Sequence, residues 1–150
     1  MKVLPTLEGG LCILPESDAD WLELELICAD AGRSSHLAES LADLMDSDSE
    51  WEQYVMPDLV QSFSSQCRYV AAAIEDARHK NEQGVFIKPS QVENWYGAIN
   101  LARLSLEARY HLNAIDATDD MKPELRSAHF RDRFYLLLQS MILEYIMDAS

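Results

Sequence analysis

The pattern of apolar and turn residues in the first fifteen positions predicts a β-hairpin. Apolar-rich runs at 3–7 and 11–14 are joined by a Gly-Gly turn, and glycine supplies the positive φ that tight hairpin turns require. Pro5 restricts the first strand to a sheet edge or a bulge, because proline cannot donate a hydrogen bond to a central ladder. The short β-prone run Val85–Ile87, which lies just before a proline, is a candidate third strand beside this hairpin.

Helical spacing dominates the rest of the chain. Ser17 is the expected N-cap of the first helix, and acidic residues follow it in the turn where the helix dipole favours them. Two Ser-x-x-Glu capping boxes, which begin at Ser49 and Ser90, predict further helix starts. Pro57 is expected to break or restart the helix that begins at Ser49. The expected helices cover 18–31, 35–44, 49–81, 91–112 and a last segment that ends near Met147.

These elements predict a mainly α protein, a single-domain helical bundle with a small N-terminal β-hairpin. The chain has 150 residues, which is the size of one domain. Hydrophobic residues make up 48% of it, enough for a sizeable core. The sequence contains no internal repeat and no interdomain linker. We therefore expect one domain over 1–150, with the hairpin at 1–15 and the bundle at 17–147.

Acidic residues are concentrated in the first part of the chain. The formal net charge is −14, and residues 1–60 hold 14 acidic and 2 basic side chains, whereas residues 61–150 hold 12 and 10. This balance argues against nucleic-acid binding and against an anionic membrane surface, because both require clustered Lys and Arg. The acidic part is either a solvated surface or a docking face for a basic partner. With no signal peptide and no spanning apolar run, we expect a cytoplasmic protein.

Motifs for catalysis or for cofactor binding are absent from the sequence. Three cysteines form no Cys-x-x-Cys pair, so they are interpreted as reduced thiols. No Gly-x-Ser-x-Gly elbow and no phosphate-binding glycine loop occurs. Glu and His recur four residues apart at Glu75/His79 and Glu107/His111, but carboxylate-bridged metal bundles use a Glu-x-x-His spacing. We expect neither a metal nor a cofactor.

The expected helix at 91–112 contains a distinctive set of residues: Trp95, Gly97, Ala98, Asn100, Arg103, Leu104, Leu106 and Arg109. It resembles the signature helix of an uncharacterised bacterial family, a domain of unknown function typical of actinobacteria. Leu101 and Glu107 stand where that family has Asp and Gly. The resemblance extends to both ends of the chain and implies no established activity.

A narrow polar stripe on this helix is the best candidate for a functional site. Asn100, Arg103, Glu107 and His111 follow one another at helical spacing, so neighbouring members can touch. They form an anion pocket built on Asn100 and Arg103, an acid–base pair of Glu107 and His111, or an ordinary row of structural ion pairs. Arg109 falls beside the apolar face, so as a buried charge it requires an acidic or carbonyl partner from another segment, such as an acid of the first part.

The last helix is apolar on nearly all sides, which predicts a central position in the bundle or a homodimer interface. The leading hypothesis is a non-catalytic protein–protein interaction or regulatory module with a protein partner, possible homodimerisation and no enzyme activity. The alternative is a small enzyme or anion-binding protein that uses the polar stripe. The candidate interface comprises Phe134, Leu137, Leu138, Met141, Ile142 and Tyr145.

Overall fold

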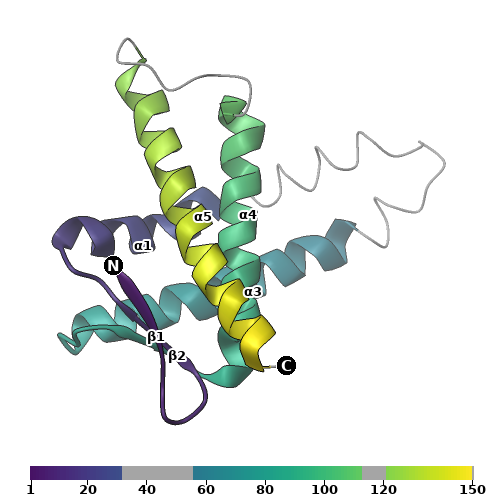
Figure 1. The fold of residues 1–150 in the computed structure, drawn as a ribbon. Coiled ribbons are helices and arrows are strands. Elements are labelled where there is room, and N and C mark those ends of the chain that lie inside the picture. The colour runs from purple at the N-terminus through teal and green to yellow at the C-terminus, as the bar shows by residue number, and fades with distance from the viewer. Residues whose placement is uncertain (32–55, 113–120, 150) are drawn as a thin grey trace.

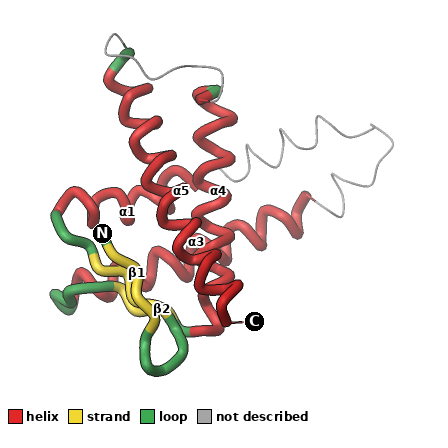
Figure 2. Tube along the Cα trace, in the orientation of Figure 1, coloured by secondary structure: helices red, strands yellow, loops and turns green. Residues whose placement is uncertain are grey.

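A computed structural model of the chain describes residues 1–31, 56–112 and 121–149 (Figure 1). Figure 2 shows a helical molecule with one small sheet near the N-terminus, which confirms the predicted fold class. The elements in chain order are β1 (Lys2–Pro5), β2 (Leu11–Leu14), α1 (Asp18–Ala31), α3 (Met56–His79), β3 (Val85–Ile87), a 3₁₀ turn (Pro89–Gln91), α4 (Val92–Tyr110) and α5 (Pro123–Ala149). The expected helix at 35–44 and the capping box at Ser49 lie outside the described residues.

The sheet is antiparallel with the strand order β1-β2-β3, so the predicted third strand does join the hairpin. Pro5 lies in the edge strand β1, where a missing N–H disturbs no central ladder. Gly9 has a φ of +93° in the hairpin turn. A Cβ on Gly10 would lie 2.1 Å from the carbonyl oxygen of Ile87. The Gly-Gly pair is therefore required both by the turn and by the close approach of β3.

The first helix begins where the sequence predicts. The Ser17 hydroxyl accepts a hydrogen bond from the Asp20 N–H at 3.3 Å, which is the expected N-cap interaction. Trp21, Leu24 and Ile27 then recur at helical spacing and are buried in the core. This periodic face fixes α1 against the rest of the bundle.

The start of α4 differs from the prediction. The capping box expected at Ser90 is not the N-cap, because Pro89 opens a 3₁₀ turn and Gln91 becomes the N-cap without a side-chain hydrogen bond. The helix itself is central, since it packs against α1, α3 and α5. Trp95, Ile99 and Leu106 are fully buried along it. A central position accounts for the many apolar residues of this helix, because three neighbouring helices cover them.

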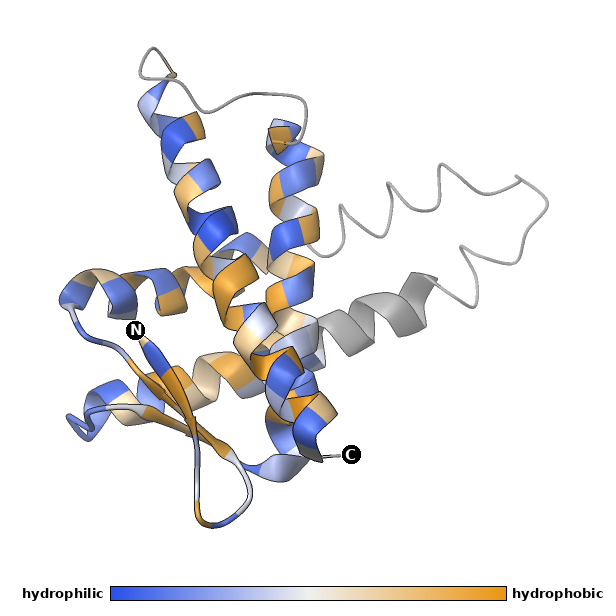
Figure 3. Cartoon of the chain, viewed as in Figure 1, coloured by the Kyte–Doolittle hydropathy of each residue, from blue (hydrophilic) through white to orange (hydrophobic). Residues whose placement is uncertain are grey.

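One face of α5 packs against α4 and the opposite face is exposed to solvent. Tyr135, Leu138 and Ile142 are fully buried, whereas Leu137 and Met147 are 50% and 67% exposed. Figure 3 shows hydrophobic and hydrophilic residues alternating around this helix. No helix in the described ranges combines the length and the apolar character that crossing a membrane requires.

Candidate functional site

Half of the predicted polar stripe forms a hydrogen-bonded ladder between α4 and α5. Arg103 Nε donates to Asp132 Oδ1 at 3.2 Å, and Arg103 Nη1 donates to Gln139 Oε1 at 2.9 Å. The Gln139 amide in turn donates to Asn100 Oδ1 at 3.2 Å. We call these four residues the α4–α5 ladder. Because Gln139 is only 6% exposed, its polar atoms require these partners, and the ladder fixes the two helices to each other.

The other half of the stripe does not converge on the ladder to form a pocket. Glu107 is half-buried near the end of α4. His111 is exposed and ends the helix with a left-handed φ of 51°, where its N–H donates to the Glu107 carbonyl. The stripe lines none of the surface hollows identified among the described residues. This geometry favours the structural interpretation of the stripe, and the anion-site alternative stays a prediction.

Arg109 has the acidic partner that its position on the helix requires. Its Nη2 donates to Asp30 Oδ1 at 3.0 Å, and its Nε donates to the Ser105 carbonyl at 3.4 Å. Asp30 lies at the end of α1, in the acidic first part of the chain, and is 4% exposed. The partner therefore comes from the region that the charge distribution indicated.

Asp30 accepts hydrogen bonds from two further side chains, both on α5. Arg131 reaches both carboxylate oxygens, at 2.8 Å from Nε and 3.2 Å from Nη2. The Tyr135 hydroxyl donates to Oδ2 at 2.6 Å. We call Asp30, Arg109, Arg131 and Tyr135 the Asp30 cluster. It joins α1, α4 and α5 through one buried carboxylate.

The charges within the Asp30 cluster stabilise the packing of the three helices. A carboxylate at a helix C-terminus faces the negative end of the dipole, and the two guanidinium groups offset this cost. Burial raises the pKa of the Tyr135 hydroxyl, and its bond to Asp30 raises that pKa further. Burial alone would lower the pKa of the Arg131 guanidinium. The bond to Asp30, together with the charges of Asp30, Tyr135 and Glu23, outweighs burial and raises that pKa.

Glu23 is an ionisable group in the surroundings of the cluster that the sequence did not single out. Its Oε2 is buried and has no hydrogen-bond partner among the described residues. Burial raises the pKa of its carboxyl, the charge of Arg131 opposes that rise, and the charge of Asp30 adds to it. Glu23 therefore holds its negative charge at a cost, because no hydrogen bond to its Oε2 offsets the effect of burial.

The sequence analysis did not identify Asp30 as the acceptor. It also did not identify the α5 residues of the α4–α5 ladder or of the Asp30 cluster. Asp30 is an acid in the last turn of a helix, where acids are disfavoured, and this placement was an available signal. Arg131 and Tyr135 are spaced i, i+4 on the buried side of α5, which is a second signal. Asp132 and Gln139 gave no comparable signal, because polar residues are common on helices.

All three cysteines, Cys12, Cys28 and Cys67, are free thiols. The Cys28 thiol donates to the Cys67 carbonyl at 3.4 Å. Burial raises the pKa of Cys28 to about 12, and the neighbouring Cys67 adds to the rise. Among the described residues, no three His, Cys, Asp or Glu side chains are grouped to hold a metal ion.

The structure corrects part of the candidate interface. Leu138 and Ile142 are fully buried in the chain's own core, so they cannot form an interface with another molecule. The Tyr145 hydroxyl donates to the Gly9 carbonyl and is half-buried there. Leu137 is the exposed member of the predicted set. The error arises because α5 is apolar on two sides, and only packing against α4 decides which side is buried.

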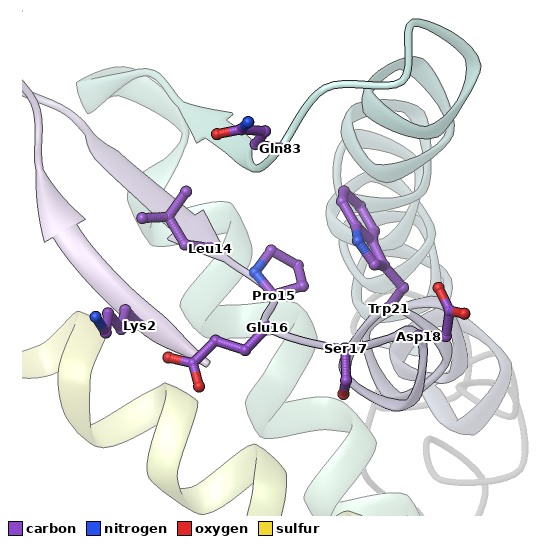
Figure 4. Close-up of a pocket in the computed structure, with 8 residues that line it drawn as sticks. All are labelled: Lys2, Leu14, Pro15, Glu16, Ser17, Asp18, Trp21 and Gln83. Carbon is purple, nitrogen blue, oxygen red and sulfur yellow. The ribbon is translucent and has the colours of Figure 1, made fainter.

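An open hollow of about 630 Å³ lies where β2 leads into α1 (Figure 4). Two carboxylates, Glu16 and Asp18, stand on its rim. Figure 4 shows Pro15 near the centre, with the Trp21 indole on one side. We call this feature the acidic hollow. Its lining residues are Lys2, Leu14, Pro15, Glu16, Ser17, Asp18, Trp21 and Gln83.

A family model described as a domain of unknown function, DUF2017, matches residues 28–147. This range includes all of α3 and α4 and all but the last two residues of α5. It begins inside α1, so it leaves out β1, β2 and every lining residue of the acidic hollow except Gln83. No curated protein and no solved structure matches the chain.

Proposed function

Because the chain belongs to the DUF2017 family, whose description assigns no activity, we propose its function from the geometry: it is a non-catalytic module that binds a basic partner protein. The observation that carries the proposal is the acidic hollow. Its carboxylates lie beside apolar and aromatic surface, a combination that suits a lysine or arginine side chain. Such a side chain buries its aliphatic stem and keeps its charged end near a carboxylate.

Two contacts within the chain support this choice of ligand chemistry. The amino group of Met1 lies 3.4 Å from Glu16 Oε2 and 3.2 Å from Asp20 Oδ2, so the rim already accepts an ammonium group. The guanidinium carbon of Arg78 lies 5.2 Å from the centre of the Trp21 ring, so that indole already accepts a cation over its face. Glu16 remains 56% exposed and Asp18 is exposed.

The non-catalytic part of the proposal is supported by the polar groups of the helices. In the α4–α5 ladder, Arg103 is held by Asp132 and Gln139. In the Asp30 cluster, the carboxylate is saturated by neighbouring side chains. A general acid or base must reach a substrate in a cleft, and neither group lines one of the hollows identified among the described residues.

Affinity capture from native lysate, with the tagged chain as bait, tests the proposal when it is followed by binding measurements on purified proteins. The captured protein should be basic, and its dissociation constant should rise with salt. The double variant Glu16→Gln/Asp18→Asn should weaken binding by about tenfold, since two rim charges are lost.

The matched control is Glu75→Gln/Glu93→Gln, which removes the same charge from exposed positions on α3 and α4. It should leave the dissociation constant within about twofold, because those charges lie outside the hollow. Equal weakening by both double variants would mean that net charge, not the hollow, attracts the partner. A dissociation constant that is unchanged in Glu16→Gln/Asp18→Asn would overturn the proposal.

A further inference from the structure

The solvent-facing side of α5 carries a regular stripe of exposed residues. Successive members are separated alternately by three and four positions, which is the a/d spacing of a coiled-coil seam. A seam of this spacing stays on one face of a helix over several turns. We call it the outer stripe. Its members, all exposed, are Phe130, Arg133, Leu137, Ser140, Glu144 and Met147.

The outer stripe is complementary to itself when it is reversed. About a midpoint between Leu137 and Ser140, these two residues exchange places, Arg133 exchanges with Glu144, and Phe130 exchanges with Met147. An antiparallel pair of α5 helices would thus match apolar with apolar residues at both ends. It would match positive with negative residues one layer further in. At the centre it would set a leucine against a small serine.

We propose that the outer stripe is a homodimer interface in which α5 packs antiparallel against α5 of a second copy. A two-fold axis passes between Leu137 and Ser140, so every contact occurs twice, as an isologous interface requires. The two Arg133–Glu144 ion pairs fix the register and the antiparallel direction, in the way that charged seam residues select coiled-coil partners. The small Ser140 side chain leaves room for Leu137 of the second copy.

The apolar content of this face is large for a surface that stays in water. Phe130 and Leu137 are 60% and 50% exposed on the stripe. Leu136 and Leu143, at 45% and 40%, lie along one flank of it. In the reversed pair these two flanking leucines approach their counterparts from the second copy. Several exposed apolar side chains on one side of a helix are a mark of an interaction site.

Charge favours a second copy over other occupants of the stripe. A basic partner would be repelled by Arg133 and an acidic one by Glu144, whereas a reversed copy satisfies both. Residues 61–150, which include α5, contribute 12 acidic and 10 basic side chains. The interface therefore lies in the nearly neutral part of a chain whose net charge is −14. This inference is independent of the basic partner, which is assigned to the acidic hollow.

Charge reversal and rescue test the proposal on the full chain. Sedimentation equilibrium or light scattering over a dilution series should give a dimer for the unaltered protein. Arg133→Glu and Glu144→Arg should each raise the dimer dissociation constant by roughly tenfold or more, because each replaces two attractions with two repulsions. The double variant Arg133→Glu/Glu144→Arg should restore the original constant, since the pairs are re-formed with exchanged signs.

Matched controls are Arg68→Glu on α3 and Glu93→Arg on α4, both at exposed positions away from the stripe. They make the same charge changes as the two single variants. Each should leave the dimer dissociation constant within about twofold of that of the unaltered protein. Circular dichroism establishes that each variant remains folded. A monomer at every concentration would overturn the proposal. A dimer that resists the single reversals, or that the double reversal fails to restore, would also overturn it, because the interface would then lie elsewhere.

Discussion

Arg109 Nη2 lies 3.0 Å from Asp30 Oδ1, and this contact joins the centre of the bundle to the end of its first helix. The side chains of Arg109 and Asp30 are 18% and 6% exposed, so little water screens the pair. Arg131 binds the same carboxylate from α5. One carboxylate therefore orients three helices, and its removal would leave two buried cations without an anion.

Arg109→Ala should destabilise the protein by about 2–3 kcal/mol, since Asp30 loses one of its two cationic partners and keeps only Arg131 and the Tyr135 hydroxyl. Arg103→Ala should cost about 1–2 kcal/mol, because it leaves the buried Gln139 amide short of one partner. Urea unfolding of both variants under identical conditions measures the difference. Arg68→Ala, at an exposed position, is the control and should change stability by less than about 0.5 kcal/mol. A larger loss at Arg103 than at Arg109 would contradict this ranking.

Glu23→Gln should stabilise the protein at neutral pH and should change how stability depends on pH. The folded state raises the pKa of Glu23, chiefly through burial, so the folded state binds a proton more readily than the unfolded state does. Stability therefore falls as pH rises from the ordinary glutamate value through the raised one. Glutamine has no ionisable carboxyl, so Glu23→Gln lacks this loss of stability with rising pH. Three charged groups act on the Glu23 carboxyl: Asp20 and Asp30 repel its negative charge, and Arg131 attracts it. All three remain in the variant.

Urea unfolding of wild type and Glu23→Gln at several pH values between about 4 and 8 measures this effect. The two free energies of unfolding should converge at the acidic end and separate toward neutrality. Glu25→Gln, on the same helix and 41% exposed, is the control. A Glu23→Gln variant that is less stable than wild type at neutral pH would show that the ionised carboxylate supports the fold through Arg131.

Gly10→Ala should disrupt the sheet, whereas Gly97→Ala should be tolerated. A Cβ at Gly10 meets the Ile87 carbonyl at 2.1 Å, and that oxygen belongs to the backbone of β3. The three atoms nearest to a Cβ at Gly97 all belong to the end of the Gln66 side chain, which can move. Alanine also favours a helix over glycine by roughly 0.5–1 kcal/mol, which offsets the displacement. Thermal unfolding should show a clear loss at Gly10 and a small change at Gly97. Similar losses at both positions would contradict this reasoning.

The fold was predictable where a local rule determines the conformation. The Ser17 N-cap, the Gly-Gly turn and the strand Val85–Ile87 each depend on neighbouring residues, and each is found where the pattern placed it. The capping box at Ser90 failed for an equally local reason, because Pro89 initiates a 3₁₀ turn that moves the N-cap to Gln91.

The candidate site was less predictable because its geometry depends on tertiary packing. The need of Arg109 for a partner follows from its position on α4, but the choice of Asp30 depends on how α1 crosses that helix. Likewise, the pattern of α5 contains two apolar sides, and the sequence alone does not decide that Leu138 is buried and Leu137 exposed. Properties set by one element could be inferred, whereas the exact partner residue and the choice of buried face, which depend on two packed helices, could not.

The thiols of the folded protein should resist alkylation. The thiolate is the reactive form, and burial raises the pKa of Cys28 to about 12 and also raises the pKa values of Cys12 and Cys67. At a pH of about 8, the thiolate fraction of Cys28 is then roughly a thousandfold below that of an ordinary cysteine, whose pKa is near 8.5. Iodoacetamide labelling followed by peptide mapping should modify Cys28 very slowly in the native chain. The same reagent should modify all three cysteines rapidly in urea, which is the control. Rapid native labelling of Cys28 would mean that α1 and α3 separate often enough to expose it.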